Sequence, residues 1–146
     1  MQRIPELQPL SRDHHQALVL ANRCRKLASQ GESAAASAQW RVVRQRFLAE
    51  LQPHFRAEEL SLIAPLQRLG EERLLNRLLE DHGLIQAYVF NGTEPTPTLL
   101  ARFGTLLAAH VRFEERQLFD CIQTRFTPEE QQRVLSHSLA ASPAHS

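Results

Sequence analysis

The stretch that decides the fold is TLLARFGTLLAAHVRFEERQLFDCIQTR, at residues 98–125. Its apolar residues recur at steps of three and four, which is the spacing of a helix that buries one face. The apolar stripe begins at Leu99, passes through Phe103 and reaches His110 before it continues to Cys121. The stretch therefore predicts one long amphipathic helix with a histidine inside its buried stripe.

Working outward from this helix, the same periodicity predicts four more. In chain order, the predicted helices cover about residues 9–29, 38 to 65–70, 71–90, 98–125 and 127–139. A small polar run at 29–33 and a proline-rich break at 91–97 separate them. Ser11 and Thr127 are the predicted N-caps of the first and last helices. Pro53 lies inside the second helix, where we expect it to kink the helix or to remove one backbone hydrogen bond.

Four long helices with short connections predict an all-α fold, an up-down-up-down four-helix bundle with a short extra C-terminal helix. A chain of 146 residues suits one domain, which we place over residues 1–146. Its core is expected at about 7–126, followed by the short helix at 127–139 and a loose tail at 140–146.

Composition and charge narrow the function. The 17 basic and 16 acidic residues give a net charge of +1, which argues against nucleic acid as a partner. No apolar run approaches the ~20 residues of a membrane span, and the opening residues lack the apolar stretch of a signal peptide. Cys24 and Cys121 form no CxxC pair, so reduced thiols are expected. We therefore expect a soluble, cytoplasmic protein that binds neither nucleic acid nor membrane.

A histidine interrupts the apolar stripe of every long predicted helix. These four histidines are His14, His54, His82 and His110. Glu58 and Glu114 each follow one of them by four residues, which places each pair on one helix face. A buried carboxylate is costly unless it is paired or binds a metal, and no lysine or arginine shares these stripes. The pattern therefore indicates a cluster of imidazoles and carboxylates inside the bundle.

The helix lengths bring most of this cluster to one height. At about 1.5 Å per residue, His14 and His54 both lie about fifteen residues from the first turn. Glu58 and His82 lie about eleven or twelve residues from the second turn. The last connection is less even, because His82 precedes it by about eight residues and His110 follows it by about thirteen. Four imidazoles and two carboxylates at mid-bundle match the ligands of one or two transition-metal ions.

Simpler interpretations exist for each residue taken alone. A histidine in an apolar stripe is usually a packed core residue, and Glu59 and Glu115 suggest a charged surface edge. The coincidence on four helices favours metal binding. We predict that His14 and not His15 faces the cluster, because His15 is rotated by ~100°. The two cysteines lie too far along their helices to bind the same metal, and we interpret them as small buried apolar residues.

The segments LSRDHHQALVLA, LQPHFRAEELSLIAPL, LLEDHGLI and LLAAHVRFEERQLF together resemble the hemerythrin-like, HHE cation-binding family, over about residues 7–126. The resemblance implies a four-helix bundle with a non-haem di-iron centre bridged by Glu58 and Glu114. Members of this family include oxygen carriers, oxygen or redox sensors, nitric-oxide-responsive proteins and iron-centre repair proteins. The metal ligands implied for this chain are His14, His54, Glu58, His82, His110 and Glu114.

The chain differs from the oxygen-carrying hemerythrins at two ligand positions. Those proteins have a second histidine four residues after the third-helix histidine, where this chain has Gln86, and they use His-x-x-x-x-Asp on the last helix. The four-histidine, two-glutamate set is closer to the iron-repair type. We expect the Gln86 amide to approach the metal and bind it weakly, which favours a reactive centre over reversible oxygen carriage.

The leading hypothesis is thus a non-haem di-iron protein that handles iron or responds to oxygen, nitric oxide or redox state. Its expected partners are small ligands such as oxygen or nitric oxide, and the sequence names no protein partner. One alternative is a di-iron enzyme of the oxidase or peroxidase type. The other is a metal-free or single-metal helical bundle that serves as a protein-interaction module. We favour a metal-binding protein over an enzyme, because the sequence shows no substrate site.

Overall fold

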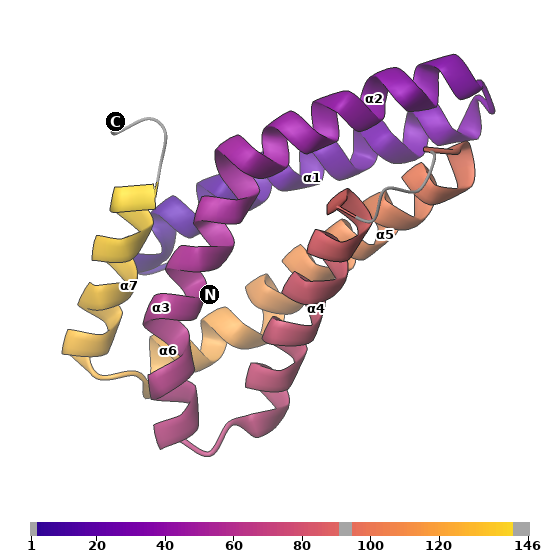
Figure 1. Cartoon of the computed structure of the whole chain (residues 1–146). Coiled ribbons are helices and arrows are strands. Elements are labelled where there is room, and N and C mark those ends of the chain that lie inside the picture. The colour runs from indigo at the N-terminus through magenta and orange to yellow at the C-terminus, as the bar shows by residue number, and fades with distance from the viewer. Residues whose placement is uncertain (1–2, 91–94, 142–146) are drawn as a thin grey trace.

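The regular structure of this chain is helical. The computed structural model describes residues 3–90 and 95–141, and no strand occurs within those ranges. Figure 1 shows the helices packed side by side as a bundle, which confirms the predicted all-α class. The helices are α1 (Gln8–Ser29), α2 (Ser33–Arg46), α3 (Gln52–Arg68), α4 (Glu72–Phe90), α5 (Pro97–Phe113), α6 (Phe119–Arg125) and α7 (Pro128–Ala141). Among the described helices, none has the length and apolar character needed to cross a membrane.

Two turns of π-helix join α2 to α3 and α5 to α6, so each of these pairs runs on as one helical segment. They are η2 (Phe47–Leu51) and η3 (Glu114–Leu118). In η2 the Gln52 N–H bonds to the Phe47 carbonyl, five residues back. Pro53 explains this turn, because its ring would collide with the carbonyl four residues earlier in a regular α-helix. The expected disturbance at Pro53 therefore takes the form of a widened turn.

Two predicted helix starts are wrong. A 3-10 turn, η1 (Pro5–Leu7), leads directly into α1, so α1 begins at Gln8 and Ser11 is not its N-cap. The Ser11 hydroxyl instead donates to Glu115 Oε2 at 3.2 Å, a contact across the bundle that local sequence does not reveal. The second helix begins at Ser33, five residues before the predicted start. The alanine-rich residues that follow are strong helix formers and extend it.

The starts of the last two predicted helices agree more closely with the bounds expected from the sequence. Thr96 caps α5 by accepting from the Leu99 N–H at 3.1 Å. Thr127 caps α7, and Glu130 accepts from the Thr127 N–H in return, which is a capping box. The helix α7 ends at 141, so the predicted loose tail starts too early. Residues 91–94 of the predicted break and 142–146 of the predicted tail lie outside the described residues.

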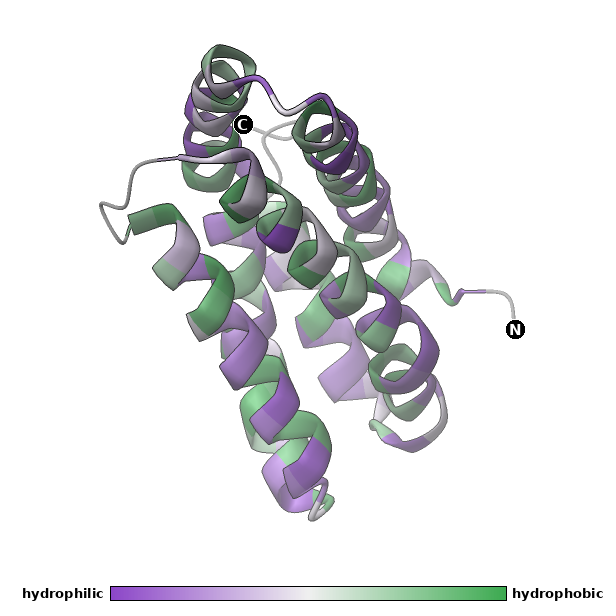
Figure 2. Cartoon of the chain, turned by 90° about the vertical axis from the view of Figure 1, so that its right-hand side faces the viewer, coloured by the Kyte–Doolittle hydropathy of each residue, from purple (hydrophilic) through white to green (hydrophobic). Residues whose placement is uncertain are grey.

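The core consists of two apolar clusters separated by the predicted metal cluster. One contains Trp40, Phe47, Phe55 and Phe103, and the other contains leucines of α1, α3 and α4 with Phe119. Each helix that carries a predicted site histidine contributes to both clusters. In α1, for example, Leu10 belongs to one cluster and Ala17 to the other, with His14 between them. Figure 2 shows that hydrophobic and hydrophilic residues alternate along the helices, as expected for amphipathic helices.

The helices α1 and α5 pack closely at Gly104. A Cβ atom built on Gly104 would lie 2.7 Å from the Ala21 carbonyl oxygen and 2.9 Å from Arg25 Cγ. These distances are too short for any side chain, so only glycine fits between the two helices here. This close approach fixes the height of α5 against α1, and with it the heights of His110 and His14.

Candidate metal centre

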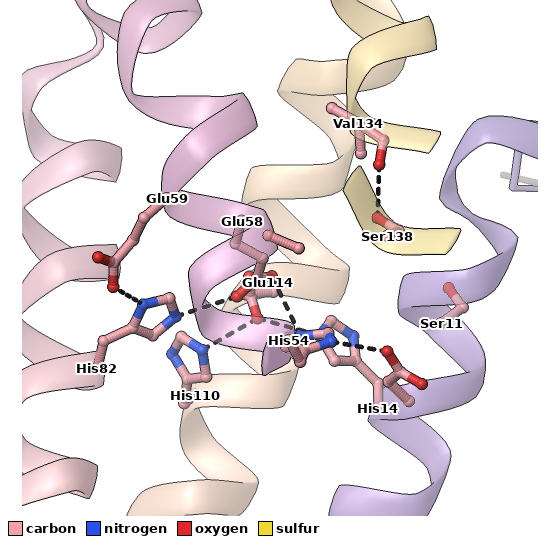
Figure 3. A network of polar contacts seen from close by, with 12 residues as sticks. Ser11, His14, His54, Glu58, Glu59, His82, His110, Glu114, Val134 and Ser138 are labelled. Carbon is pink, nitrogen blue, oxygen red and sulfur yellow. Dashed lines mark hydrogen bonds and ion pairs between the residues drawn. The ribbon is translucent and has the colours of Figure 1, made fainter. Parts of the chain in front are cut away.

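The six predicted ligands lie together in the middle of the bundle, one or two from each helical segment (Figure 3). Every one of them is at least 96% buried. They form two overlapping groups of four, whose possible ligand atoms lie within 4.8 Å of one another. The first group is His14, His54, Glu58 and Glu114, and the second is Glu58, His82, His110 and Glu114. Both groups share the two glutamates.

All four imidazoles turn the Nε2 atom toward the glutamates. The Nε2 atoms of His14 and His110 both lie 3.0 Å from Glu114 Oε1. The Nε2 of His82 lies 3.0 Å from Glu58 Oε1, and that of His54 lies 3.4 Å from Glu58 Oε2. The uneven spacing of His82 and His110 from their loop does not separate them, since their ring centroids are 5.1 Å apart.

Within the described residues, three polar atoms at the centre of this cluster make no hydrogen bond of good geometry, although two of them lie within ion-pair distance of a neighbour. They are Glu58 Oε2, Glu114 Oε2 and His110 Nε2. A buried polar atom without a partner costs about 1–3 kcal/mol, and more if it is charged. Ionised carboxylate oxygens and neutral imidazole nitrogens both bind transition-metal cations. The donor set therefore fits a cation, which would supply the partner that these atoms lack.

The charges of the cluster also favour a cation. Burial lowers the pKa of His110, but Glu114 and Asp81 outweigh burial and raise this pKa to about 10. Burial likewise opposes the charged form of His14, His54 and His82, yet the carboxylates raise the pKa of each. The two glutamates thus attract positive charge strongly, as protons on the imidazoles or as metal ions that replace them.

Sequence reasoning missed a second set of acidic residues around the cluster. Each imidazole Nδ1 makes a hydrogen bond to one carboxylate, and we call these four residues the outer carboxylates. The pairs are His14–Glu115 at 2.6 Å, His54–Asp13 at 3.0 Å, His82–Glu59 at 2.8 Å and His110–Asp81 at 2.9 Å. Glu59 and Glu115, interpreted above as a charged surface edge, therefore support the site. A signal was present, because each outer carboxylate is adjacent in sequence to a predicted ligand.

Gln86 does not approach the cluster. Its side chain is exposed and lines a surface cavity with Gly83, Ala87 and Phe90. The buried stripe of α4 continues from His82 to Ile85, so the position four residues after His82 is rotated outward. On the inner side the ring of Phe55 stacks against His82, with centroids 3.9 Å apart. The expectation that the Gln86 amide is a weak ligand is therefore wrong.

The remaining expectations about facing are confirmed. His14 is buried, whereas His15 is exposed. Cys24 and Cys121 are free, buried, and members of the two opposite apolar clusters. Burial raises the pKa of the Cys24 thiol to about 11, so this thiol stays protonated at neutral pH.

The fold and the cluster together define a helical bundle with a buried histidine–glutamate site suited to cations. Comparison with protein families gives the same answer: residues 6–122 match the Hemerythrin HHE cation binding domain. This chain therefore belongs to the hemerythrin HHE cation-binding family. Neither the search of curated proteins nor that of solved structures finds a match.

Proposed function

We propose that this protein is cytoplasmic and binds a pair of non-haem iron ions. With these ions it handles iron or responds to oxygen, nitric oxide or redox state. The observation that carries the proposal is the pair of overlapping four-residue groups that share Glu58 and Glu114. Two shared carboxylates between two pairs of imidazoles form an arrangement that suits two neighbouring cations bridged by glutamate.

The residues divide into two half-sites. His14 and His54 would hold one ion, His82 and His110 the other, and Glu58 with Glu114 would serve both. Bound iron would supply one-electron redox chemistry and coordination positions for small ligands such as oxygen or nitric oxide. Two imidazoles for each ion leave coordination positions open, whatever residue stands at Gln86. Openness favours a reactive or sensing centre over a reversible oxygen carrier.

The chain's own residues would prepare the site for this chemistry. The apolar clusters on both sides exclude water from the glutamates, which strengthens their attraction for cations. The outer carboxylates would accept hydrogen bonds from the Nδ1–H groups and so leave the Nε2 lone pairs directed inward. The up-down-up-down order of the four long segments belongs to the same proposal. Its support is that the site histidines of sequential segments lie together, with ring centroids 5.2 Å apart for His14 and His54.

Metal analysis of the purified protein tests this function directly. After anaerobic reconstitution with ferrous iron and removal of free metal, we expect up to about two iron ions per chain. Less than a tenth of an ion per chain would contradict the proposal and favour the metal-free interaction module. The double variant Glu58→Ala/Glu114→Ala is expected to retain no iron. Glu72→Ala/Glu129→Ala is the matched control, because both of these glutamates are exposed and far from the cluster in sequence.

A further inference from the structure

The outer carboxylates connect the helices in a closed ring around the cluster. Each lies on one helical element and accepts a hydrogen bond from the histidine of another. The ring passes from α1 to α3, from α3 to α4, from α4 to α5, and from η3 back to α1. The four members of this ring differ in how firmly the protein holds them.

Two outer carboxylates are fixed by further donors. Asp81 also accepts from Arg77 Nε at 2.8 Å, and its side chain is only 6% exposed. The Glu115 side chain is 29% exposed, but it accepts from the Ser11 hydroxyl at 3.2 Å and from Arg3 Nε at 3.3 Å. Both guanidinium groups also lie over phenylalanine rings, at 5.2 Å for Arg3 and 4.8 Å for Arg77. Asp81 and Glu115 are therefore held from both sides.

The other two outer carboxylates, which we call open, lack further donors within the described part of the chain and are the most exposed of the four. The side chains of Asp13 and Glu59 are 34% and 40% exposed. Within the described residues, each makes one hydrogen bond, to its histidine. Arg56 acts on Glu59 by charge but donates no hydrogen bond to it. Water can therefore compete for both of these carboxylates.

This difference coincides with the division between the two glutamates. The fixed carboxylates hold His14 and His110, whose Nε2 atoms contact Glu114. The open carboxylates hold His54 and His82, whose Nε2 atoms contact Glu58. The cluster thus has a fixed side at Glu114 and an open side at Glu58, and each half-site contains one imidazole of each kind.

We propose that the outer carboxylates are positioning residues. When metal is lost, the imidazoles of the open side, His54 and His82, detach from it before His14 and His110 do. A carboxylate can only accept, so it keeps the proton on Nδ1 and directs the Nε2 lone pair at the metal. Where the carboxylate is fixed, the ring cannot swing away. Because the open side detaches readily, detachment of the fixed side limits the rate of metal loss.

The test compares four carboxylate-to-amide variants, which preserve shape. It rests on the proposed function, because the probe is ferrous iron loaded anaerobically and withdrawn by excess chelator. We expect Asp81→Asn and Glu115→Gln to speed release by about 10–100-fold, the usual effect of losing such a partner. Asp13→Asn and Glu59→Gln are expected to change the rate less than about threefold, since they do not affect the rate-limiting side. Glu72→Gln is the control for a distant carboxylate.

Two further variants test the same inference in case a carboxylate variant fails to fold. Arg77→Gln and Arg3→Gln keep every outer carboxylate and remove only the groups that fix them. Both should accelerate release, while Arg56→Gln should not. The thermal unfolding midpoint of each metal-free variant reports any general damage, which a positioning role does not require.

The outcomes separate the two proposals. A wild-type protein that retains no iron contradicts the proposed function itself. If the wild type binds iron, release from the Asp81 and Glu115 variants at least threefold faster than from the Asp13 and Glu59 variants supports the inference. A smaller ratio, or the reverse order, overturns the inference and leaves the metal site standing. If an Asp81 or Glu115 variant does not fold, the arginine variants decide by the same ratio against Arg56→Gln.

Discussion

The polar layer in the middle of the bundle and the apolar clusters beside it are built in opposite ways. The apolar clusters fill space with side chains that need no partner, such as Phe47 and Phe103, both fully buried. The polar layer buries six ionisable side chains, and among the described residues atoms of Glu58, His110 and Glu114 make no hydrogen bond. Such a layer weakens a metal-free bundle. The contrast teaches that packing sets the stability of this chain, whereas the polar layer has the residues suited to holding a cation.

The largest effect should appear when a residue of the polar layer is compared with its neighbour in sequence. We expect His14→Ala to lower iron affinity by more than about 100-fold, because it removes a ligand rather than a supporting partner. His15→Ala should leave affinity unchanged, since His15 is exposed. Equilibrium competition with a chelator of known affinity measures both variants. Metal loss from His15→Ala alone would reverse the assignment of the two histidines.

In the apolar cluster that contains Phe103, a substitution should lower the stability of the fold and not the affinity for iron. Phe103 is fully buried and meets Trp40 edge-on, with ring centroids 5.5 Å apart. Phe103→Ala should lower the free energy of unfolding of the metal-free protein by about 3–5 kcal/mol. Urea unfolding followed by circular dichroism measures this change. A change below 1 kcal/mol would show that this end of the bundle collapses around the cavity.

Converting the polar layer to an apolar one should have the opposite sign. Replacing the four site histidines and the buried Asp81 by leucine, and Glu58 and Glu114 by methionine, should abolish iron binding. The free energy of unfolding of the metal-free protein should rise by about 1–4 kcal/mol, as found when buried charged groups are replaced by apolar ones of similar volume. The same urea titration measures it. A bundle destabilised by this exchange would mean that the polar layer stabilises the fold without metal.

Two glycines inside helices offer a smaller and finer comparison. Gly104→Ala places a Cβ against the Ala21 carbonyl and should destabilise the protein by about 1–3 kcal/mol. Gly83→Ala meets no atom within 4 Å and should stabilise α4 by up to about 1 kcal/mol. The thermal unfolding midpoints of the two variants, compared with that of the wild type, measure both changes. Equal shifts would contradict the close approach of α1 and α5.

The smallest effect is expected at Gln86. Because its side chain lies outside the bundle, Gln86→His should add no ligand and leave iron content and release rate unchanged. The measurement is the same chelator assay used for the ring of outer carboxylates. Slower release from this variant would show that the imidazole reaches the cluster after all.

The sequence predicted the inner part of the site because that part follows helix periodicity. His14, His54, His82 and His110 interrupt apolar stripes, and a stripe of constant period predicts which way a residue faces. The same reasoning failed for Gln86, whose position four residues after His82 falls at the edge of a narrow stripe. A spacing of four residues predicts a shared face but does not decide between the inside and the border of the bundle.

The outer part of the site and the helix starts depend on contacts between distant segments. Asp13 and Asp81 bond to histidines 41 and 29 residues away, so periodicity within one helix does not reveal them. Ser11 looked like an N-cap by its type, but its hydroxyl serves Glu115, 104 residues later. The π-turns also lay beyond periodicity, because the sequence indicates a disturbance at Pro53 without giving its form.

The π-turn at Glu114–Leu118 changes how this chain should be compared with others. Such a turn contains one residue more than the α-helix around it would need. Deleting one residue there would restore a regular helix and leave His110 and Glu114 in place. Because the turn takes up the extra residue, the later side chains, Phe119 and Ile122 among them, would keep facing the core that now buries them. An alignment of this helix therefore needs a gap inside η3, and residues before and after that gap follow two different helical phases.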